Sequence, residues 1–480
     1  MNAPRIATVL ALAILLAVAA WAPLVDRDEP RYAQAVREMH QSGDLLVPKN
    51  FEQLRPDKPV LVYWLQWAAT TLVGERELGF RLPSFLALLA WLWLAAQLAQ
   101  ELCDEKRWAL VPGMALAGVL ATPDALVGAL TTASLLAFVR AAKCRHYWWA
   151  FLAWLLFGLG VLAKGPVTPL FVLPALAGYC GRGKELWRAA VPWWGPLLSA
   201  AVVAAWFLPA NLATDWDFAR LGLGKHVVQR ALSPLESHGI RGRLGVLLGP
   251  PFYLASLAVA GFPLLLSLVR FLRADEKKDP QVWRTVVWGV LGPMAVLSLV
   301  ATKLPHYILP ALPLLFVASR PTRGQQVAGA IASAVLALGL LLLTLGTPYR
   351  PAGLLVRRLP QLTCAFPLQE PSLRFYAGEK LIVTPSTNGG CGFWLLRAGE
   401  EEKLRGFLAP SAQPIRTFSG WNLAKGRKET LRLYQLKIGR REKENPGPGG
   451  SSAESPTGRG FILAAKNGLP STRRTAILAR

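Results

Sequence analysis

The feature that most restricts the fold of this chain is a series of apolar runs that recur from the N-terminus to residue 346. Runs of about twenty residues cross the roughly 30 Å hydrocarbon core of a bilayer as helices, because a helix satisfies its own backbone hydrogen bonds in lipid. We predict spans near residues 6–25, 82–100, 108–121, 123–142, 147–163, 165–180, 191–210, 250–270, 285–301, 304–319 and 325–346. The sequence therefore predicts a polytopic α-helical membrane protein with about 11 to 13 spans.

The composition supports this class of protein and disfavours two others. Of the 480 residues, 53% are hydrophobic, only 17% are charged, and 18 are Trp. The net charge of +24 would suit a nucleic-acid partner, but Lys and Arg in cytoplasmic loops and near anionic head groups account for it in a membrane protein. We therefore expect membrane lipids as partners and no nucleic acid. The five cysteines form no CxxC pair and no metal-spaced cluster, so they indicate neither a zinc site nor a redox motif.

The positive charges of the short loops predict which side of the membrane each loop faces. They gather in alternate loops, which the positive-inside rule assigns to the cytoplasm: Arg5, Lys106/Arg107, Arg140/Lys143/Arg145, Arg182/Lys184/Arg188, Arg270/Arg273/Lys277/Lys278/Arg284 and Arg320/Arg323. The outer face then receives the other connections: the first outer loop 26–81, the turn 122–124, Lys164, the loop 211–249, residues 302–303 and everything after about residue 347.

Two apolar segments need separate interpretation. A full span over residues 60–73 would reverse every later loop, so we predict a helix that lies in the outer interface instead. Its predicted aromatic anchors are Tyr63, Trp64 and Trp67. The first apolar run contains an AVA triplet at residues 17–19 that resembles a signal-peptide cleavage site. Its apolar stretch is long for a signal peptide, so we expect a retained span.

The chain changes character after residue 346. The stretch PSLRFYAGEKLIVTPSTNGGCGFWLL, residues 371–396, shows short apolar strands separated by Gly, Asn and Ser, and the later EEKLRGFLA indicates a helix. We predict a small extracytoplasmic α/β domain over 347–440, after a transmembrane catalytic domain over 1–346. Cys364 and Cys391 lie in this part and can pair in an oxidising compartment. Residues 441–480 lack apolar periodicity and read as a disordered tail.

The stretch DRDEPRYAQAVREM, residues 26–39, follows the first uncharged run directly. Pro30 suits the first position of a helix, Gly43 suits its end, and the apolar residues between them form one stripe. We therefore expect a short amphipathic helix on the membrane surface. Asp28 or Glu29 would lie at its N-terminus, where backbone N–H groups stabilise a carboxylate. A simple helix cap is the alternative interpretation of either residue.

Further charged residues fall at the ends of predicted spans on the same outer face. RPDKPVLVYW, ATPDAL, AKGPV and ATKLPHYILP contribute Asp57, Lys58, Asp124, Lys164, Lys303, His306 and Tyr307. Each lysine alone is explained by a side chain that reaches from the membrane to the interface. Together these residues indicate a pocket for an anionic head group. A carboxylate can orient or deprotonate an acceptor hydroxyl there, while cations neutralise a departing phosphate.

The order of the motifs resembles a known family. DEPRYAQAVREMHQSGDLLVP, RPDKPVLVYWLQ, GFRLPSFLA, TPDAL, LAKGP, KHVVQR, KLPHYILPALP and PSLRFYAGEK follow one another as in bacterial lipid-linked-sugar transferases of the aminoarabinose transferase and protein O-mannosyltransferase type. The resemblance covers about residues 5–436 and implies a GT-C membrane fold. It implies a glycosyltransferase of the bacterial inner membrane, with the site facing the periplasm. The sugar would move, with inversion, from a polyprenyl phosphate to lipid A or another lipid, glycan or protein acceptor.

The charge pattern and the resemblance together assign roles to single residues of this chain. The catalytic set would be Asp28, Glu29 and Asp124. The substrate-binding set would be Arg31, Tyr32, Asp57, Lys58, Tyr63, Arg81, Lys164, His226, Arg230, His238, Lys303, His306 and Tyr307. Within it, Lys58, Arg230 and Lys303 are expected to hold the donor phosphate. Lys225 and Pro30 depart from the usual motifs and leave the acceptor open.

Other interpretations remain. The triplet Asp26-Arg27-Asp28 is a literal DxD, the metal motif of nucleotide-sugar transferases, but no Gly-rich α/β domain surrounds it. We assign no metal ligands and no definite cofactor, although clustered carboxylates at Asp28, Asp57 or Asp124 can recruit a divalent cation. A transporter or flippase would place ionisable residues at mid-membrane and show repeats. An inactive relative would not need these charged residues together.

Overall fold

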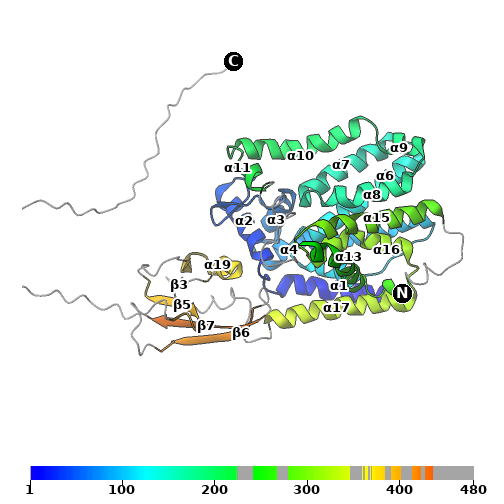
Figure 1. The fold of residues 1–480 in the computed structure, drawn as a ribbon. Coiled ribbons are helices and arrows are strands. Elements are labelled where there is room, and N and C mark those ends of the chain that lie inside the picture. Colours follow the sequence, from blue (N-terminus) through cyan, green and yellow to red (C-terminus); the bar gives the residue numbers. More distant parts are fainter. Residues whose placement is uncertain are drawn as a thin grey trace, which may run out of the picture. The chain divides into compact units, whose positions relative to one another are not determined.

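The computed structural model of the chain describes residues 2–222, 224, 242–267 and 279–345, and in the C-terminal part 359–360, 363–365, 368, 370–383, 391–401, 413–422 and 427–435. Long helices occupy the first part and a small sheet the second (Figure 1). The predicted domain boundaries after residues 346 and 440, the predicted helix at EEKLRGFLA and the tail lie outside the described residues. They stay predictions.

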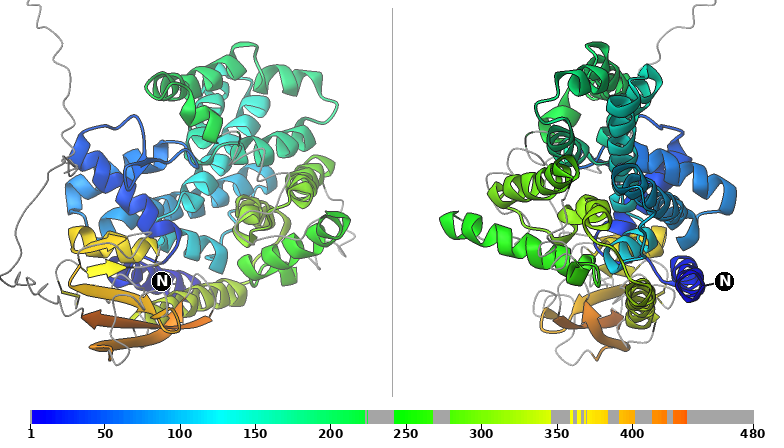
Figure 2. Two further views of the ribbon diagram at one scale, coloured as in Figure 1. Left: turned by 60° about the vertical axis from the view of Figure 1, so that its left-hand side comes forward. Right: turned by 90° about the vertical axis from the view of Figure 1, so that its right-hand side faces the viewer.

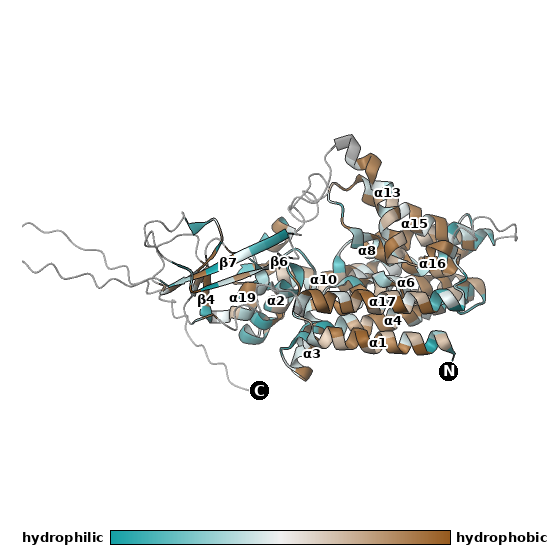
Figure 3. Ribbon diagram, turned by 90° about the horizontal axis from the view of Figure 1, so that it is seen from below, coloured by the Kyte–Doolittle hydropathy of each residue, from teal (hydrophilic) through white to brown (hydrophobic). Residues whose placement is uncertain are grey.

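Seven apolar helices of the described part are long enough to cross a membrane. They are α1 (Ala3–Trp21), α4 (Glu77–Cys103), α6 (Asp124–Cys144), α7 (Tyr147–Lys164), α10 (Trp194–Leu212, preceded by α9, Lys184–Ala190), α15 (Pro280–Leu299) and α17 (Arg323–Leu345). Shorter apolar helices are α8 (Val167–Cys180), α13 (Gly242–Ala260), and η2 (Pro305–Ala311) with α16 (Leu312–Ala318). Figure 3 shows apolar residues along α1, α17, α15 and α13, as a bilayer requires. The prediction of a polytopic helical membrane protein is confirmed.

Each predicted span overlaps a helix, but the segment 108–121 contains only the short α5 (Pro112–Val119). Pro112 begins this helix, and Leu120 already has an extended backbone with ψ of 141°. The following turn leads into Pro123, and a residue before proline avoids helical geometry. α5 is therefore too short to cross the bilayer as a regular helix.

The helices share an apolar core around Trp91 of α4, which is fully buried. α6 is the most enclosed of the seven long helices, with 78% of its apolar window buried, and it lies against α4, α7 and α8. A side chain at Gly128 of α6 would come within 2.4 Å of the Trp91 ring. The small residue therefore allows α4 and α6 to approach closely.

The first outer loop forms two helices and a small hairpin. These elements are α2 (Asp28–Ser42), β1 (Lys49–Asn50), β2 (Gln53–Leu54) and α3 (Leu61–Val73). α3 has 13 residues, a rise of about 20 Å, which is too short to cross the bilayer. It agrees with the predicted interfacial helix. One predicted anchor differs, because Tyr63 is fully buried inside the loop and does not face lipid.

The C-terminal part contains a mixed sheet of five strands in the order β4-β3-β5-β7-β6. Its strands are β3 (Thr363–Ala365), β4 (Leu381–Val383), β5 (Phe393–Arg397), β6 (Arg416–Asn422) and β7 (Arg427–Gln435). β3 runs parallel to β4 and β5, while β7 is antiparallel to β5 and β6. A disulfide joins Cys364 and Cys391, the pair predicted from the sequence.

One stretch of this part is not a strand. Residues 371–377, where strand structure was expected, form α19 (Pro371–Ala377), followed by η4 (Gly378–Lys380). Pro371 at the helix start needs no N–H partner, and Gly378, with φ of 53°, ends the helix. α19 connects the parallel strands β3 and β4 and lies beside α2 in both views of Figure 2.

Candidate active site

α2 presents Asp28 to solvent at its N-terminus. The helix begins at Asp28 and ends before Gly43, whose φ of 71° suits glycine. Pro30 is the third residue of the helix rather than the first. Proline is tolerated there, because the first N–H groups of a helix have no acceptor within the helix. The Asp28 side chain is 65% exposed, and Arg31 Nη1 lies 4.0 Å from its Oδ1. The carboxylate is therefore accessible and stabilised by the helix dipole.

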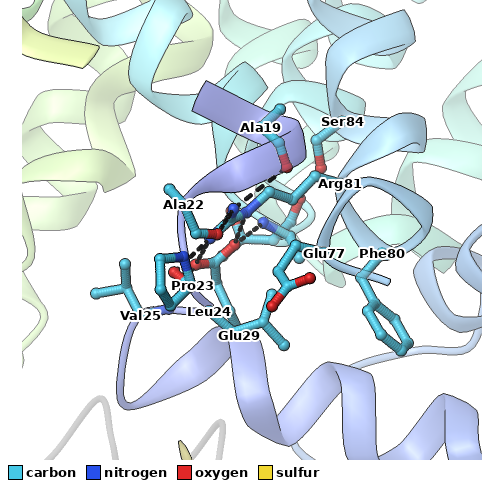
Figure 4. Close-up of polar contacts among 12 residues, drawn as sticks. Ala19, Ala22, Pro23, Leu24, Val25, Glu29, Glu77, Phe80, Arg81 and Ser84 are labelled. Atoms are coloured by element: carbon cyan, nitrogen blue, oxygen red, sulfur yellow. Dashed lines mark hydrogen bonds and ion pairs between the residues drawn. The ribbon is translucent and has the colours of Figure 1, made fainter. Parts of the chain in front are cut away.

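Glu29, the next residue, points in a different direction from α2 and is buried. Arg81 of α4 donates two hydrogen bonds to it, Nε to Oε1 at 2.7 Å and Nη2 to Oε2 at 2.8 Å (Figure 4). The backbone N–H of Ala121 donates to Oε1 at 2.6 Å, and that of Val25 to Oε2 at 2.7 Å. Both carboxylate oxygens of Glu29 therefore have two protein donors each.

The remaining donors of Arg81 hold the end of α1. Its Nη1 donates to the carbonyls of Ala19, at 3.3 Å, and Ala22, and its Nη2 donates to Pro23 at 2.9 Å (Figure 4). These carbonyls belong to the last turn of α1 and the residues after it, where a helix leaves acceptors unpaired. The Glu29–Arg81 pair thus joins α1, α2, α4 and the connection before α6 beneath Asp28.

A second buried cation, Arg55, organises the loop beside Asp28. Arg55 follows β2, and its Nε donates to the Tyr63 hydroxyl at 2.7 Å and lies 3.1 Å from Asp57 Oδ1. Its guanidinium stacks over the Tyr32 ring, 4.6 Å from the centroid. Burial raises the pKa of the Tyr63 phenol, which therefore stays protonated. Sequence reasoning did not select Arg55, although it directly precedes the PDKP motif.

Lys58 lies next to this cluster. Its Nζ is 3.7 Å from Asp57 Oδ2 and donates to the Asp57 carbonyl at 3.2 Å. The Lys58 side chain is only 18% exposed. Asp57 is thus located between two cations, Arg55 and Lys58, and fixes their relative position.

The ends of three membrane helices contribute a second group of charges. Lys164, the last residue of α7, forms an ion pair with Asp124, the first residue of α6. Thr122 donates to the other oxygen of Asp124 at 2.9 Å. The Lys164 ammonium lies 5.6 Å from the ring centroid of Tyr307 in η2, and the half-buried His306 ring meets Tyr307 edge-on at 5.0 Å.

Charges of both groups act on a common residue, His306. The half-buried His306 ring lies in the electrostatic field of Asp124 and Lys164, and also of Asp28 and Lys58 from the first loop. The fold therefore brings together carboxylates and cations that lie far apart in the sequence. In the described ranges, no three His, Cys, Asp or Glu side chains form a group that could hold a metal ion.

Several predicted site residues are placed differently. Lys303 turns its Nζ to the end of α15, donating to the carbonyls of Ser298, at 2.8 Å, Leu297, at 3.4 Å, and Val300. This is the usual position of a lysine at a helix C-terminus. Arg81 is fully buried with Glu29. His226, Arg230 and His238 lie outside the described residues and stay predictions.

An apolar groove of about 440 Å³ in the first outer loop is lined by Leu45, Leu46, Trp64, Trp67 and Ala68. Indole N–H groups fix its wall, since Trp64 donates to the Leu45 carbonyl at 2.8 Å and Trp206 of α10 to the Leu46 carbonyl at 2.9 Å. The groove therefore combines apolar side chains with a well-held backbone.

Sequence comparison supports the resemblance that the motifs predicted. A family model described as Dolichyl-phosphate-mannose-protein mannosyltransferase matches residues 57–208. An undecaprenyl phosphate-alpha-4-amino-4-deoxy-L-arabinose arabinosyl transferase of Pectobacterium carotovorum subsp. carotovorum is 30% identical over 315 residues, 60% of this chain and 52% of that protein. The protein of the same description from Pseudomonas aeruginosa (strain LESB58) is 30% identical over 311 residues, 61% and 53% of the two chains. The chain spans about half the length of these curated relatives.

Structural comparison shows the fold. The crystal structure of ArnT from Cupriavidus metallidurans bound to undecaprenyl phosphate matches with a TM-score of 0.66 and 16% identity, over 89% of this chain and 97% of that chain. Its apo state matches with a TM-score of 0.65 at the same identity and coverage. The predicted GT-C membrane fold with a small C-terminal sheet region is therefore confirmed.

Proposed function

We propose that this protein is an inverting glycosyltransferase that moves a sugar from a polyprenyl-phosphate donor to an envelope acceptor such as lipid A. The reaction would take place at the periplasmic face of the inner membrane. The observation that carries the proposal is the juxtaposition of the accessible Asp28 carboxylate with Lys58 and the Asp124–Lys164–His306 group at the ends of membrane helices. The names of the relatives and the undecaprenyl phosphate bound to ArnT support the donor class.

Asp28 is the group that acts on the acceptor. Inversion requires the acceptor oxygen to attack the anomeric carbon on the face opposite the phosphate, so donor and acceptor must be held in line. An exposed carboxylate at the start of α2 can orient the acceptor, or remove its proton when the nucleophile is a hydroxyl. Glu29 supports Asp28 from below by fixing α2 and does not touch the substrate in this proposal.

The donor phosphate lies near Lys58 and Lys164. Negative charge develops on the leaving phosphate as the glycosidic bond breaks, and cations already fixed in place stabilise it without reorganisation. Asp57 holds Lys58, and Asp124 holds Lys164. Lys303 is left out of this set because backbone carbonyls of α15 accept from its ammonium. Arg230 remains a predicted phosphate contact.

The prenyl chain would enter along the apolar groove formed by Leu45, Leu46, Trp64, Trp67 and Ala68. A long lipid tail explains why charged chemistry takes place at the level of the membrane surface. A transporter would instead need ionisable groups inside the membrane, whereas Asp124 and Lys164 are the terminal residues of their helices.

The test is mass spectrometry of envelope lipids and glycoproteins from cells with the intact protein, a deletion, or Asp28→Asn. We expect one sugar mass to disappear from one acceptor in both altered strains. Asp217→Asn is a matched control, because Asp217 also begins a helix, α11 (Asp217–Ala219), is 58% exposed and pairs with the arginine three residues later. That strain should keep the modification.

The possible outcomes separate the candidate acceptors. Loss of an aminopentose from lipid A supports the activity named for the relatives, and loss of a hexose from proteins supports the mannosyltransferase described for the family model. An unchanged glycoconjugate profile in the deletion strain would contradict the proposal. So would full modification by a normally expressed Asp28→Asn protein.

A further inference from the structure

The motif PSLRFYAG, residues 371–378, has no role in the proposed reaction, yet it forms α19 and contacts the first outer loop. The backbone N–H of Ser372 donates to Asp26 Oδ1 at 2.7 Å, and the Ser372 hydroxyl bonds to Asp26 Oδ2. Ser372 is fully buried, and Asp26 is half-buried, two residues before Asp28. A pair separated by 346 residues thus holds the start of α2.

A second residue of α19 holds the segment before Asp26. The Tyr376 hydroxyl accepts from the backbone N–H of Leu24 at 2.9 Å and donates to Glu77 Oε1 at 2.9 Å. Leu24 lies between α1 and α2, and Glu77 is the first residue of α4. Tyr376 therefore links α19 to the same helices that the Glu29–Arg81 pair joins, from the outer side.

Other α19 residues hold the rest of α2 and the hairpin. Arg37 donates to the Phe375 carbonyl at 2.8 Å and stacks over the Phe375 ring, 3.9 Å from its centroid. Arg374 stacks over Phe51 at 3.6 Å. Phe375 also meets Phe80, the neighbour of Arg81, edge-on at 5.8 Å. Each of these contacts is made by a residue of the motif, so the motif side chains hold α19 against the first outer loop.

We propose that α19 positions the catalytic end of α2, with Ser372 acting through Asp26 as a positioning residue for Asp28. This inference rests on the proposed glycosyl transfer. It gives the C-terminal part a role in the reaction. The carboxylate of Asp28 keeps its position relative to the acceptor only if the residues before α2 are fixed. Asp26 precedes α2, so the hydrogen bonds within that helix do not fix it. Ser372 makes two hydrogen bonds to its carboxylate instead.

The kinetic test uses purified full-length protein and a polyprenyl-phosphate sugar. Ser372→Ala and Asp26→Ala should each lower kcat about ten- to a hundredfold and leave the KM for the donor nearly unchanged, because misplacement of the acceptor end costs the chemical step. The double variant should be no worse than either single variant. Asp26→Asn, which can still accept from the Ser372 N–H, should recover most of kcat. Additive losses, or a normal kcat in Ser372→Ala, would overturn the proposal.

Ser419→Ala is the matched control, because the Ser419 hydroxyl also makes a hydrogen bond in the C-terminal part, to Thr430 at 2.9 Å, away from the first loop. It should keep wild-type kcat. An equal loss in Ser419→Ala and Ser372→Ala would show that general loosening of the sheet explains the effect, and would reject a specific role for Ser372.

Hydrogen exchange separates this inference from the proposed function. The amides of Leu24 and Val25 donate to Tyr376 and Glu29, so they should exchange slowly in the wild type. Ser372→Ala should increase exchange over residues 24–32, and Ser419→Ala should not. If the wild type transfers no sugar, the proposed function fails and the positioning role with it, even where exchange rises. If it transfers sugar but exchange and kcat are unchanged in Ser372→Ala, only the positioning role fails.

Discussion

Asp28 and Glu29 are adjacent acidic residues with opposite surroundings. Asp28 is 65% exposed and has one cation 4.0 Å away, whereas the Glu29 side chain is 2% exposed and receives four hydrogen bonds, two of them from Arg81. One helix turns them apart, since successive residues of a helix point in different directions. The buried carboxylate fixes the helix, and the other one stays accessible to solvent.

The same contrast holds for other described charges near α2. Buried charges are tolerated only when protein groups replace the lost water, and Glu29, Arg81 and Arg55 have such partners. Asp28, by contrast, keeps access to solvent and has only a cation at 4.0 Å. A charge motif of this kind therefore contains structural residues, which are buried and paired like Glu29, and accessible residues like Asp28. Burial and the number of partners distinguish the two kinds.

The largest expected effect is on the buried pair. Arg81→Ala leaves the Glu29 carboxylate buried without its cation, which should cost about 3–5 kcal/mol of stability and leave little folded protein. The measurement is the yield and thermal midpoint of the detergent-solubilised protein. Arg140→Ala is the control, because Arg140 binds Glu101 at 2.9 Å but is 25% exposed, and it should cost less than about 1 kcal/mol. A stable Arg81→Ala protein would contradict the structural role of the Glu29–Arg81 pair.

An intermediate effect is expected for Lys164. Its side chain is 8% exposed, between the fully buried Arg81 and the exposed Asp28. Lys164→Met should lower kcat about a hundredfold through loss of phosphate stabilisation, and should lower stability by about 1–3 kcal/mol because Asp124 loses its cation. Adding Asp124→Asn should restore stability without restoring activity. Thermal midpoints and donor turnover of both variants check this. Recovery of activity in the double variant would mean that Lys164 serves only to neutralise Asp124.

The smallest effect is a pH dependence at Asp26. Burial raises the pKa of this carboxyl from 3.8 to about 6, against the hydrogen bonds from Ser372 and with Glu370 and Arg31 acting in opposite directions. The folded protein thus binds the proton more tightly than the unfolded chain, so its stability should fall as pH rises from about 4 to about 6 and then stay level. Asp26→Asn should lack this slope. Thermal midpoints at about pH 4.5 and about pH 7.5 compare the two proteins, and parallel changes would contradict the assignment.

Much of the architecture was predictable because its signals are local. Apolar length indicated the membrane helices, and Gly43 marked the end of α2. Helix ends also carried the charges that meet at the site, such as Asp124 and Lys164. Short strands were expected within residues 371–396, and β4 and β5 are there, but residues 371–377 form a helix. Their apolar residues suit a short helix as well as a strand, and Pro371 and Gly378 select the helix.

The sequence by itself determined that this chain crosses the membrane repeatedly and carries charged residues at the ends of several helices. Only the tertiary structure decided which charges are buried with a partner and which stay accessible to solvent. Glu29 meets Arg81 from 52 positions away, and Asp26 meets Ser372 from 346 positions away. Hydrophobic length and turn residues act between neighbours in the chain. The pairing and desolvation of a charge depend on every element that surrounds it, and those elements come together only in the fold.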